Sequence, residues 1–450
     1  MAILAGLGGM NTAIINPSYV HLGKELHVST VRASYQTTIV IAINGIAPFL
    51  WLPLANVYGR RPFYLIATLI GFVSALGCAY VHTFRQLLAA RFFNGWMPIA
   101  FTLGAVTVAD LFPFEQRGRA MGVYTVLMTN GSHLAPIVGG LIGQYLGWRW
   151  TFKFAAICDA VMFTVMLFCL PETLYVRRPE ALTETNHERL SFKNYRHMLR
   201  FWTRDPALKL RARQFVLPSI KMMKYPSVIF PAMYYASQYG FASILPAVTV
   251  ASIFTQFFHW DTLDIGLAYG GALTIGSFVG EFMAGMVVDW IVKHERKKLG
   301  GADPPPEVRL KAIWTGEFLV PAGLLIYGFT LTYRTAWIAP IFGMGLACCG
   351  LQVVTTTCYT YAIDCYRLES SETSQVFNFF RQEFGMTFAF YTIPMARRIG
   401  YQWTFFFFAC MGSILGFIPI LGLMWRGRQI RERLGRPKNI NSLDSDPVET

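Results

Sequence analysis

The chain has 450 residues, of which 54% are hydrophobic and 14% charged, and it is therefore far more apolar than an ordinary soluble protein of this length. A formal net charge of +14 could indicate a nucleic-acid partner, so the positions of the basic residues along the chain are decisive. The eight cysteines contain no pair spaced for zinc or for a redox motif, so we expect no metal site and no cofactor.

Apolar segments of about 20 residues, the length that crosses a hydrocarbon core, recur along almost the whole chain. A soluble helical protein would instead show polar stripes at helical spacing, and segments 63–80 and 405–424 show none. The sequence therefore predicts an all-α membrane protein with twelve transmembrane helices. The predicted spans cover residues 1–22, 33–56, 63–81, 87–109, 119–144, 150–170, 226–256, 265–289, 310–332, 336–362, 373–395 and 402–425.

Lysine and arginine residues gather in alternate loops, which is the bias that orients membrane proteins. With both termini in the cytoplasm, the inside loops hold most of them and the outside loops hold few. The positive charge therefore reflects topology, and we expect no nucleic-acid partner. The inside groups are Arg60, Arg61, Arg117, Arg119, residues 177–224, 293–298, Arg309, Lys311, Arg367 and 426–438; the outside residues are Lys24, Arg32, Arg85, Arg149, Lys153, Arg334, Arg397 and Arg398. Within the central loop, residues 197–225 interleave basic and apolar side chains, which suits either a helix on an anionic membrane surface or a solvated linker.

An internal repeat divides the chain into two parts. The sequence GWRWTF begins at Gly147 after the fifth span, and GYQWTF begins at Gly400 after the eleventh. Parallel repeats of this kind are typical of carriers whose halves rock about a site near the bilayer midplane. We expect two six-helix pseudo-repeats, with domain boundaries at 1–170 for the N-terminal bundle, 171–225 for the central cytoplasmic loop, 226–425 for the C-terminal bundle and 426–450 for a cytoplasmic tail.

Several local motifs accompany the repeat. After the second span the chain reads LANVYGRRP, and in the corresponding loop of the second half it has Gly285 and Asp289. Together the motifs resemble those of the major facilitator superfamily, in particular its fungal twelve-span drug:proton antiporters, over almost the whole chain. Asn56 stands where the family usually has an aspartate. The resemblance implies conformational roles for these residues: Gly59, Arg60, Arg61, Asp110, Glu115, Arg117, Gly131, Pro136, Gly139, Gly140 and Asp289.

The fifth span carries the spaced glycines around a proline that this antiporter family shows, with Ala135 in place of one glycine. Small residues allow close helix approach, and proline bends a span where two halves pivot. Simple helix packing explains the same spacing equally well. Pro171-Glu172-Thr173 after the sixth span resembles the family's boundary motif between the halves.

Ionisable groups inside the membrane are costly and mark candidate coupling residues. The resemblance implies that Arg91 takes part in proton coupling, while a structural arginine bonded to backbone carbonyls is the alternative. Glu281 in the eighth span is a candidate protonatable carboxylate. Arg381 and Glu383 in the eleventh span are two positions apart, so they need partners from other spans, and Arg381 with Glu281 is one geometric option. Glu317, Asp159 and His133 are weaker candidates.

Aromatic and neutral polar residues in the seventh and tenth spans indicate a substrate site. Tyrosine rings near a carboxylate would suit an organic cation through cation–π contacts, although aromatic packing accounts for any single residue as well. The candidate substrate-binding residues are Asn94, Tyr234, Tyr235, Gln238, Tyr239, Gln352 and Tyr359.

These features predict a secondary active transporter that exports a small organic molecule, such as an organic cation, a drug or a secondary metabolite, in exchange for protons. A proton symporter or facilitator for nutrient uptake is the alternative, and a membrane sensor or a membrane enzyme is more distant. We expect no enzyme activity, a monomer in the lipid bilayer, and, from the resemblance, a plasma-membrane location.

Overall fold

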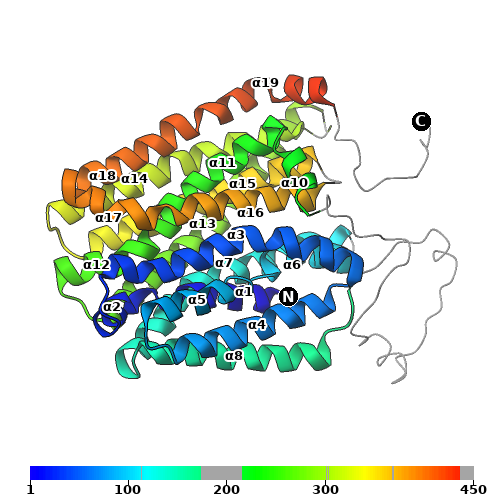
Figure 1. The fold of residues 1–450 in the computed structure, drawn as a ribbon. Coiled ribbons are helices and arrows are strands. Elements are labelled where there is room, and N and C mark those ends of the chain that lie inside the picture. Colours follow the sequence, from blue (N-terminus) through cyan, green and yellow to red (C-terminus); the bar gives the residue numbers. More distant parts are fainter. Residues whose placement is uncertain (113, 174–214, 301, 303, 367–368, 436–450) are drawn as a thin grey trace.

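The computed structural model describes residues 1–112, 114–173, 215–300, 302, 304–366 and 369–435, and it confirms the twelve-span fold (Figure 1). The first six spans form the N-terminal half. Their elements are α1 (Ala2–Ala13), η1 (Asn16–Ser18) and α2 (Tyr19–Glu25), which form one span, then α3 (Thr30–Tyr58), α4 (Arg61–Ala79), α5 (Phe84–Asn94) with α6 (Ala100–Leu111), α7 (Phe114–Tyr145) and α8 (Trp148–Cys169).

The last six spans form the C-terminal half, preceded by the short helix α10 (Leu217–Met222). Most of the predicted central-loop segment 197–225 lies outside the described residues. The elements of this half are α11 (Pro226–Tyr239), η4 (Gly240–Ile244) and α12 (Leu245–Phe258), then α13 (Thr262–Lys298), η5 (Pro306–Ala312) with α14 (Ile313–Thr332), α15 (Ile338–Cys365), α16 (Ser370–Met386) with α17 (Phe388–Ile399), and α18 (Tyr401–Cys410), η6 (Met411–Gly416) and α19 (Ile418–Leu434).

Eight of the described helical stretches are long and apolar enough to cross a membrane by length and composition alone. Three of the remaining spans are broken into shorter helices, namely α1 to α2, α5 to α6, and α16 to α17. The last helix continues past the predicted span end at residue 425 to Leu434, where Arg428 and Glu432 form an i, i+4 ion pair at 2.8 Å.

The repeated motifs adopt the same backbone conformation in both halves. Gly147 has φ +88° and ψ 159° at the start of α8, and Gly400 has φ +90° and ψ 152° at the start of α18. A side chain would strain this positive φ, which explains why both copies of the motif begin with glycine. The repeat is therefore a structural feature of both halves.

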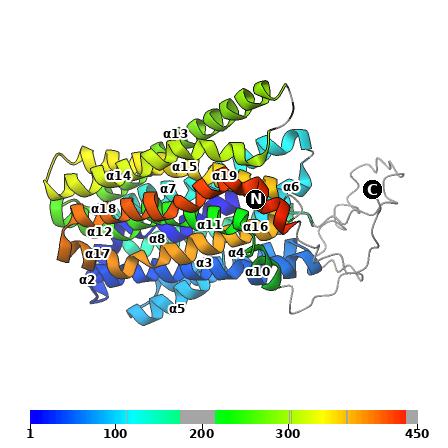
Figure 2. The same cartoon turned by 90° about the horizontal axis from the view of Figure 1, so that it is seen from above.

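The bundle has two ends, which we name from their connections. The linker face carries residues 59–60 and 170–173 and the end of α19, and the hairpin face carries the short connections 26–29, 146–147 and 259–261 (Figure 1). The charge distribution predicts that the linker face is cytoplasmic. At this face α13 projects away from the other spans (Figure 2).

A carboxylate caps the third span at the linker face. The backbone N–H groups of Arg60 and Arg61 donate to the two Glu172 carboxylate oxygens at 2.9 and 3.2 Å, and Arg61 Nη2 donates to the Leu167 carbonyl at 2.8 Å. Glu172 thus places a negative charge at the N-terminus of α4, where the helix dipole favours it. Asn56, where the family usually has an acid, is exposed.

We expect Glu172→Ala to lower the free energy of unfolding by about 1–2 kcal/mol, because two N–H groups at the start of α4 lose their acceptor. The melting temperature of the detergent-solubilised protein should fall accordingly. Asn56→Ala, at an exposed position on the preceding helix, is the control and should leave it unchanged. Equal melting temperatures for Glu172→Ala and the parent would contradict the capping role.

The C-terminal half joins the corresponding spans, but here the carboxylate lies on the third span and its partner on the sixth. Glu307, at the start of its third span, accepts from Arg431 near the end of α19 at 2.8 Å, and Arg309 pairs with Asp364 at 2.9 Å. Each half therefore ties its third span to its sixth span at the linker face, within that half.

The two halves meet along two seams. The more extensive seam joins α7 to α13, and the other joins α3 to α16 and α17. At the hairpin face the Thr262 hydroxyl and His21 Nδ1 are 2.8 Å apart, and Tyr35 and Phe390 pack with ring centroids 5.1 Å apart. The halves are thus joined at the hairpin face in this structure.

Candidate functional site between the two halves

Arg381 of α16 lies where the C-terminal half meets α3 and α6 of the N-terminal half. Its side chain is 8% exposed, Nη2 donates to Asn378 Oδ1 at 2.8 Å, and Nη1 donates to the Tyr235 hydroxyl at 3.3 Å. Its Nε is buried without a partner. No carboxylate among the described residues forms an ion pair with it, and the predicted option of Glu281 is not realised in this structure.

Tyrosine rings surround the Arg381 guanidinium. The guanidinium carbon lies 4.9 Å from the centroid of the Tyr239 ring, which is cation–π geometry. The Tyr235 ring packs on Tyr239 and Tyr359 with centroids 5.9 and 5.4 Å apart. Three of the predicted substrate-binding residues, from α11 and α15, therefore meet around one cation.

The N-terminal half completes this cluster. The Phe101 ring of α6 lies 5.8 Å from the Arg381 guanidinium carbon. Asn378, which holds Arg381, donates from Nδ2 to the Asn44 carbonyl of α3 at 3.0 Å. We call Arg381, Tyr235, Tyr239, Tyr359 and Phe101 the arginine cage. Any rocking of the halves changes its shape, because Phe101 lies in one half and the other four in the other.

Sequence reasoning missed Asn378, Asn44 and Phe101. The available signal was the presence of asparagine within apolar spans, since an amide in a membrane needs a hydrogen-bond partner. Which partner it takes depends on the packing of distant spans.

Glu383 lies in the seam between α3 and α16. Its Oε1 lies so close to Gly45 of α3 that a Cβ built there would come within 2.4 Å of it. This oxygen is buried and has no hydrogen-bond partner among the described residues. Glu383 therefore faces a different helix from Arg381, as the spacing of two residues predicts.

Arg91 belongs to a network inside the N-terminal half. It is fully buried and donates to Gln36 Oε1 at 2.5 Å, to the Asn11 carbonyl at 2.8 Å, to Asn94 Oδ1 at 2.9 Å and to the Thr12 carbonyl at 3.2 Å. Its partners lie on the first, second and fourth spans. The geometry is that of an arginine bonded largely to backbone and amide oxygens, the structural alternative described above.

The Arg91 network reaches a buried acid. Asn11 Nδ2 lies 3.0 Å from both carboxylate oxygens of Asp159 on α8. Asn11 thus links Arg91, through its carbonyl, with Asp159, through its amide. Asp159 is fully buried in the N-terminal half.

Other predicted substrate residues point into their own halves. Asn94 Nδ2 donates to the Ser74 hydroxyl at 3.2 Å, and Gln352 Nε2 donates to the Ser277 hydroxyl at 2.7 Å. The Tyr234 hydroxyl donates to Glu317, and Gln238 Nε2 lies against Gly412 of the twelfth span. These four predicted residues do not join the arginine cage.

The remaining predicted coupling and motif residues lie at several places. Glu281 is half-buried on α13, and Asp289 is exposed near the linker-face end of the same helix. His133 is buried on α7, with Nδ1 unpartnered among the described residues. The side chains of Asp110, Glu115 and Arg117 lie outside the described part of the structure.

The glycines of the fifth span make close backbone contacts. A Cβ on Gly131 would lie 2.4 Å from the Gly6 Cα, and one on Gly139 would lie within 2 Å of the Ile14 carbonyl, both in the first span. Gly140 instead faces α13, and Gly266 of α13 faces the Pro136 carbonyl and Gly140. The predicted motif therefore packs α7 on its own half and on the opposite half.

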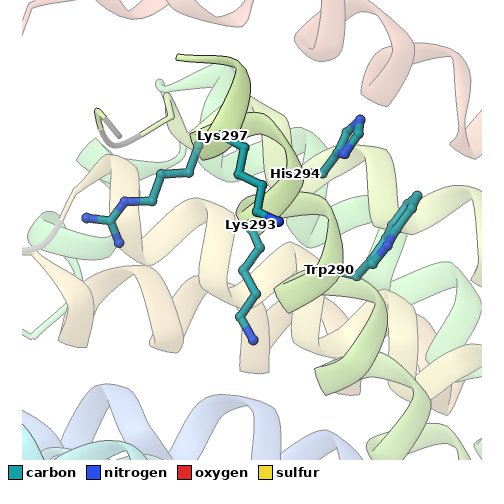
Figure 3. Close-up of a pocket in the computed structure, with 5 residues that line it drawn as sticks. Trp290, Lys293, His294 and Lys297 are labelled. Atoms are coloured by element: carbon teal, nitrogen blue, oxygen red, sulfur yellow. The ribbon is translucent and has the colours of Figure 1, made fainter. Parts of the chain in front are cut away.

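A separate pocket of about 520 Å³ lies on the linker-face end of α13, lined by Trp290, Lys293, His294, Arg296 and Lys297 (Figure 3). The basic side chains spread in different directions, while the Trp290 and His294 rings stack at 5.7 Å. Basic residues beside a tryptophan are typical of a membrane–water boundary. The pocket lies apart from the arginine cage.

The fold and the buried charged residues between two similar halves define a membrane transporter. The chain belongs to the Major Facilitator Superfamily, whose family model matches residues 1–390. This confirms the predicted family.

Relatives and solved structures agree with this assignment. The chain is 28% identical over 406 residues to "Efflux pump radE" of Floropilus chiversii, covering 89% of this chain and 73% of that protein. It is 28% identical over 416 residues to "Efflux pump atB" of Aspergillus terreus, covering 90% and 86%. Its fold is similar to the partially occluded inward-open xylose transporter XylE of E. coli, with a TM-score of 0.64, 16% identity and coverage of 94% and 95% of the two chains.

Proposed function

We propose that this transporter exports a small organic molecule across the plasma membrane in exchange for protons, with both termini in the cytoplasm. Membership of the superfamily supports transport by alternating access. The direction is supported by fungal relatives that are named efflux pumps. If the linker face is cytoplasmic, the contacts at the hairpin face close the transporter on its outer side. A transporter closed on that side is in the state that would take up substrate from the cytoplasm.

The observation that carries proton coupling is the position of Glu383. Among the predicted coupling residues, it is the acid that touches the opposite half, at Gly45. A negative charge is costly in a partly buried seam without a cationic partner, whereas a protonated carboxyl is tolerated. Protonation of Glu383 would therefore stabilise the contact between α3 and α16, and deprotonation would favour separation of these two helices.

We expect Glu383→Gln to reduce substrate-triggered proton flux in proteoliposomes by at least about tenfold, because glutamine remains neutral and cannot release a proton. The assay records an internal pH dye while a panel of organic cations, organic acids and neutral metabolites is added. Glu281→Gln is run in parallel as the second candidate carboxylate.

Asp264→Asn is the matched control, because Asp264 is an exposed acid on α13 at the hairpin face. It should leave the flux unchanged. Proton flux in Glu383→Gln equal to that of the parent would contradict the role of Glu383. Substrate movement without proton flux in any variant would instead identify a facilitator.

A further inference from the structure

Given the proposed export function, we propose that the transported compound carries an acidic group, a carboxylate or an acidic phenol, and that Arg381 is its counter-ion. This narrows the substrate class and departs from the organic cation that the tyrosines alone suggested. Three observations carry the proposal: unused donors, the absence of an acid in the arginine cage, and its position between the halves.

Arg381 has donors to spare. A guanidinium carries five N–H groups in a fork that matches the two oxygens of a carboxylate. Its hydrogen bonds to Tyr235 and Asn378 occupy one Nη each, and the buried Nε has no partner. Because Arg381 is only 8% exposed, these unused N–H groups lie in the protein interior.

Arg91 provides an internal comparison. It is also buried in a span, but four hydrogen bonds to oxygen atoms occupy its Nε and both Nη atoms. Arg91 is therefore satisfied by the fold of its own half. Arg381 has fewer bonds, and one comes from a tyrosine hydroxyl at 3.3 Å.

The arginine cage contains no acid among the described residues. The titratable groups that interact with Arg381 are four tyrosines: Tyr235, Tyr239 and Tyr359 of the cage, and Tyr124 on α7 of the opposite half. Glu317 is bound to Tyr234, and Glu383 faces Gly45 of α3. An arginine buried without a counter-ion is costly, and a bound anion would offset that cost.

The same arrangement disfavours an organic cation. Tyr239, which would supply a cation–π face, already faces the Arg381 guanidinium at 4.9 Å. A bound cation beside the same ring would be repelled by the arginine, because like charges repel more strongly in a protein interior than in water. The tyrosine rings therefore hold the arginine, and their remaining edges and hydroxyls suit an aromatic acid.

The position of the cage connects anion binding with transport. Phe101 comes from the N-terminal half, and Asn378 ties Arg381 to the Asn44 carbonyl of that half. Rocking of the halves breaks or remakes these contacts, so the anion site differs between the two states. A bound acid that prefers one state shifts the equilibrium by its difference in affinity.

The test compares two ligands that differ in charge, 6-hydroxy-2-naphthoate and its neutral amide, 6-hydroxy-2-naphthamide, with tetraphenylphosphonium as the cation. Binding to the full chain in detergent is measured by equilibrium dialysis at neutral pH. We expect the naphthoate to bind at least about tenfold more tightly than the amide, because a charge-assisted bidentate pair replaces a neutral contact.

Arg381→Met should abolish the preference for the carboxylate, and Arg381→Lys should reduce it, since an ammonium lacks the planar fork. Arg398→Met is the matched control, an exposed arginine on α17 in the same span, and should keep the preference. If the Arg381 variants fail to fold, the ratio between naphthoate and amide in the parent remains decisive.

Tighter binding of tetraphenylphosphonium than of naphthoate, or no saturable naphthoate binding by the parent, would overturn the proposal. Retained carboxylate preference in a folded Arg381→Met protein would overturn it too. Because the assay measures binding, it is independent of proton flux: a cation that drives proton flux while naphthoate does not bind refutes the acid substrate and leaves proton-coupled export standing.

Discussion

Gly266→Leu is expected to abolish transport while leaving the folded protein in the membrane. In the present state, a Cβ at Gly266 would lie 2.4 Å from the Pro136 carbonyl and 2.8 Å from the Gly140 Cα. These contacts are between backbones of opposite halves, so no side chain can move aside. Overpacking costs about 1–3 kcal/mol even in a core that adjusts. Here that cost destabilises only the state in which α7 and α13 are in contact. The equilibrium therefore shifts away from the state closed at the hairpin face.

The shift can be measured with a cysteine at Ser18. This residue is fully buried beside Gly143 at the hairpin face. With the eight native cysteines replaced, a membrane-impermeant maleimide should label Ser18→Cys faster in the Gly266→Leu background than in the parent.

Gly271→Leu is the matched control on the same helix, because a Cβ there meets nothing within 4 Å. It should leave both transport and labelling unchanged. Normal transport by Gly266→Leu would show that the α7–α13 contact is not required for alternating access.

Arg91→Met is expected to destabilise the N-terminal half severely. The substitution leaves the Gln36 and Asn94 side-chain oxygens and the carbonyls of Asn11 and Thr12 without this donor. Each buried acceptor left unsatisfied costs about 1–3 kcal/mol. The melting temperature should fall by at least about 5 °C, and the yield of monodisperse protein should fall with it.

Thermal unfolding and proton flux together separate the two interpretations of Arg91. Arg85→Met, an exposed arginine on the same helix α5, is the control and should match the parent. A melting temperature equal to that of the parent, combined with lost proton flux, would favour the coupling role that the family resemblance implies over the structural role.

The twelve spans could be predicted because each depends on a local property, the length of an apolar run. The glycines at 147 and 400 could be predicted as a repeat. Both adopt the same positive φ, because each stands in the same position directly before a helix of its half. The predicted fourth span, 87–109, is divided in the structure into α5 and α6, because Gly95 and Pro98 interrupt the helix.

The candidate site was predicted in part. Tyr235, Tyr239, Tyr359 and Arg381 were all selected from the sequence, but as members of different sets, three for substrate and one for protons. Tyr234, one residue from Tyr235, points instead to Glu317. Successive residues of a helix point in different directions, and helical periodicity does not show which other span each side chain contacts.

The twelve spans, the repeated halves and the family could all be inferred without a structure, because these features follow from the length of apolar segments and from local motifs. The surroundings of the two buried arginines emerged from the folded chain: Arg91 is hydrogen-bonded within one half, whereas Arg381 lies between the halves among tyrosines, with no acid beside it among the described residues. The physical reason is that the hydrogen bonds and the energetic cost of a buried charge depend on the groups around it, and these groups come from spans far apart in the chain.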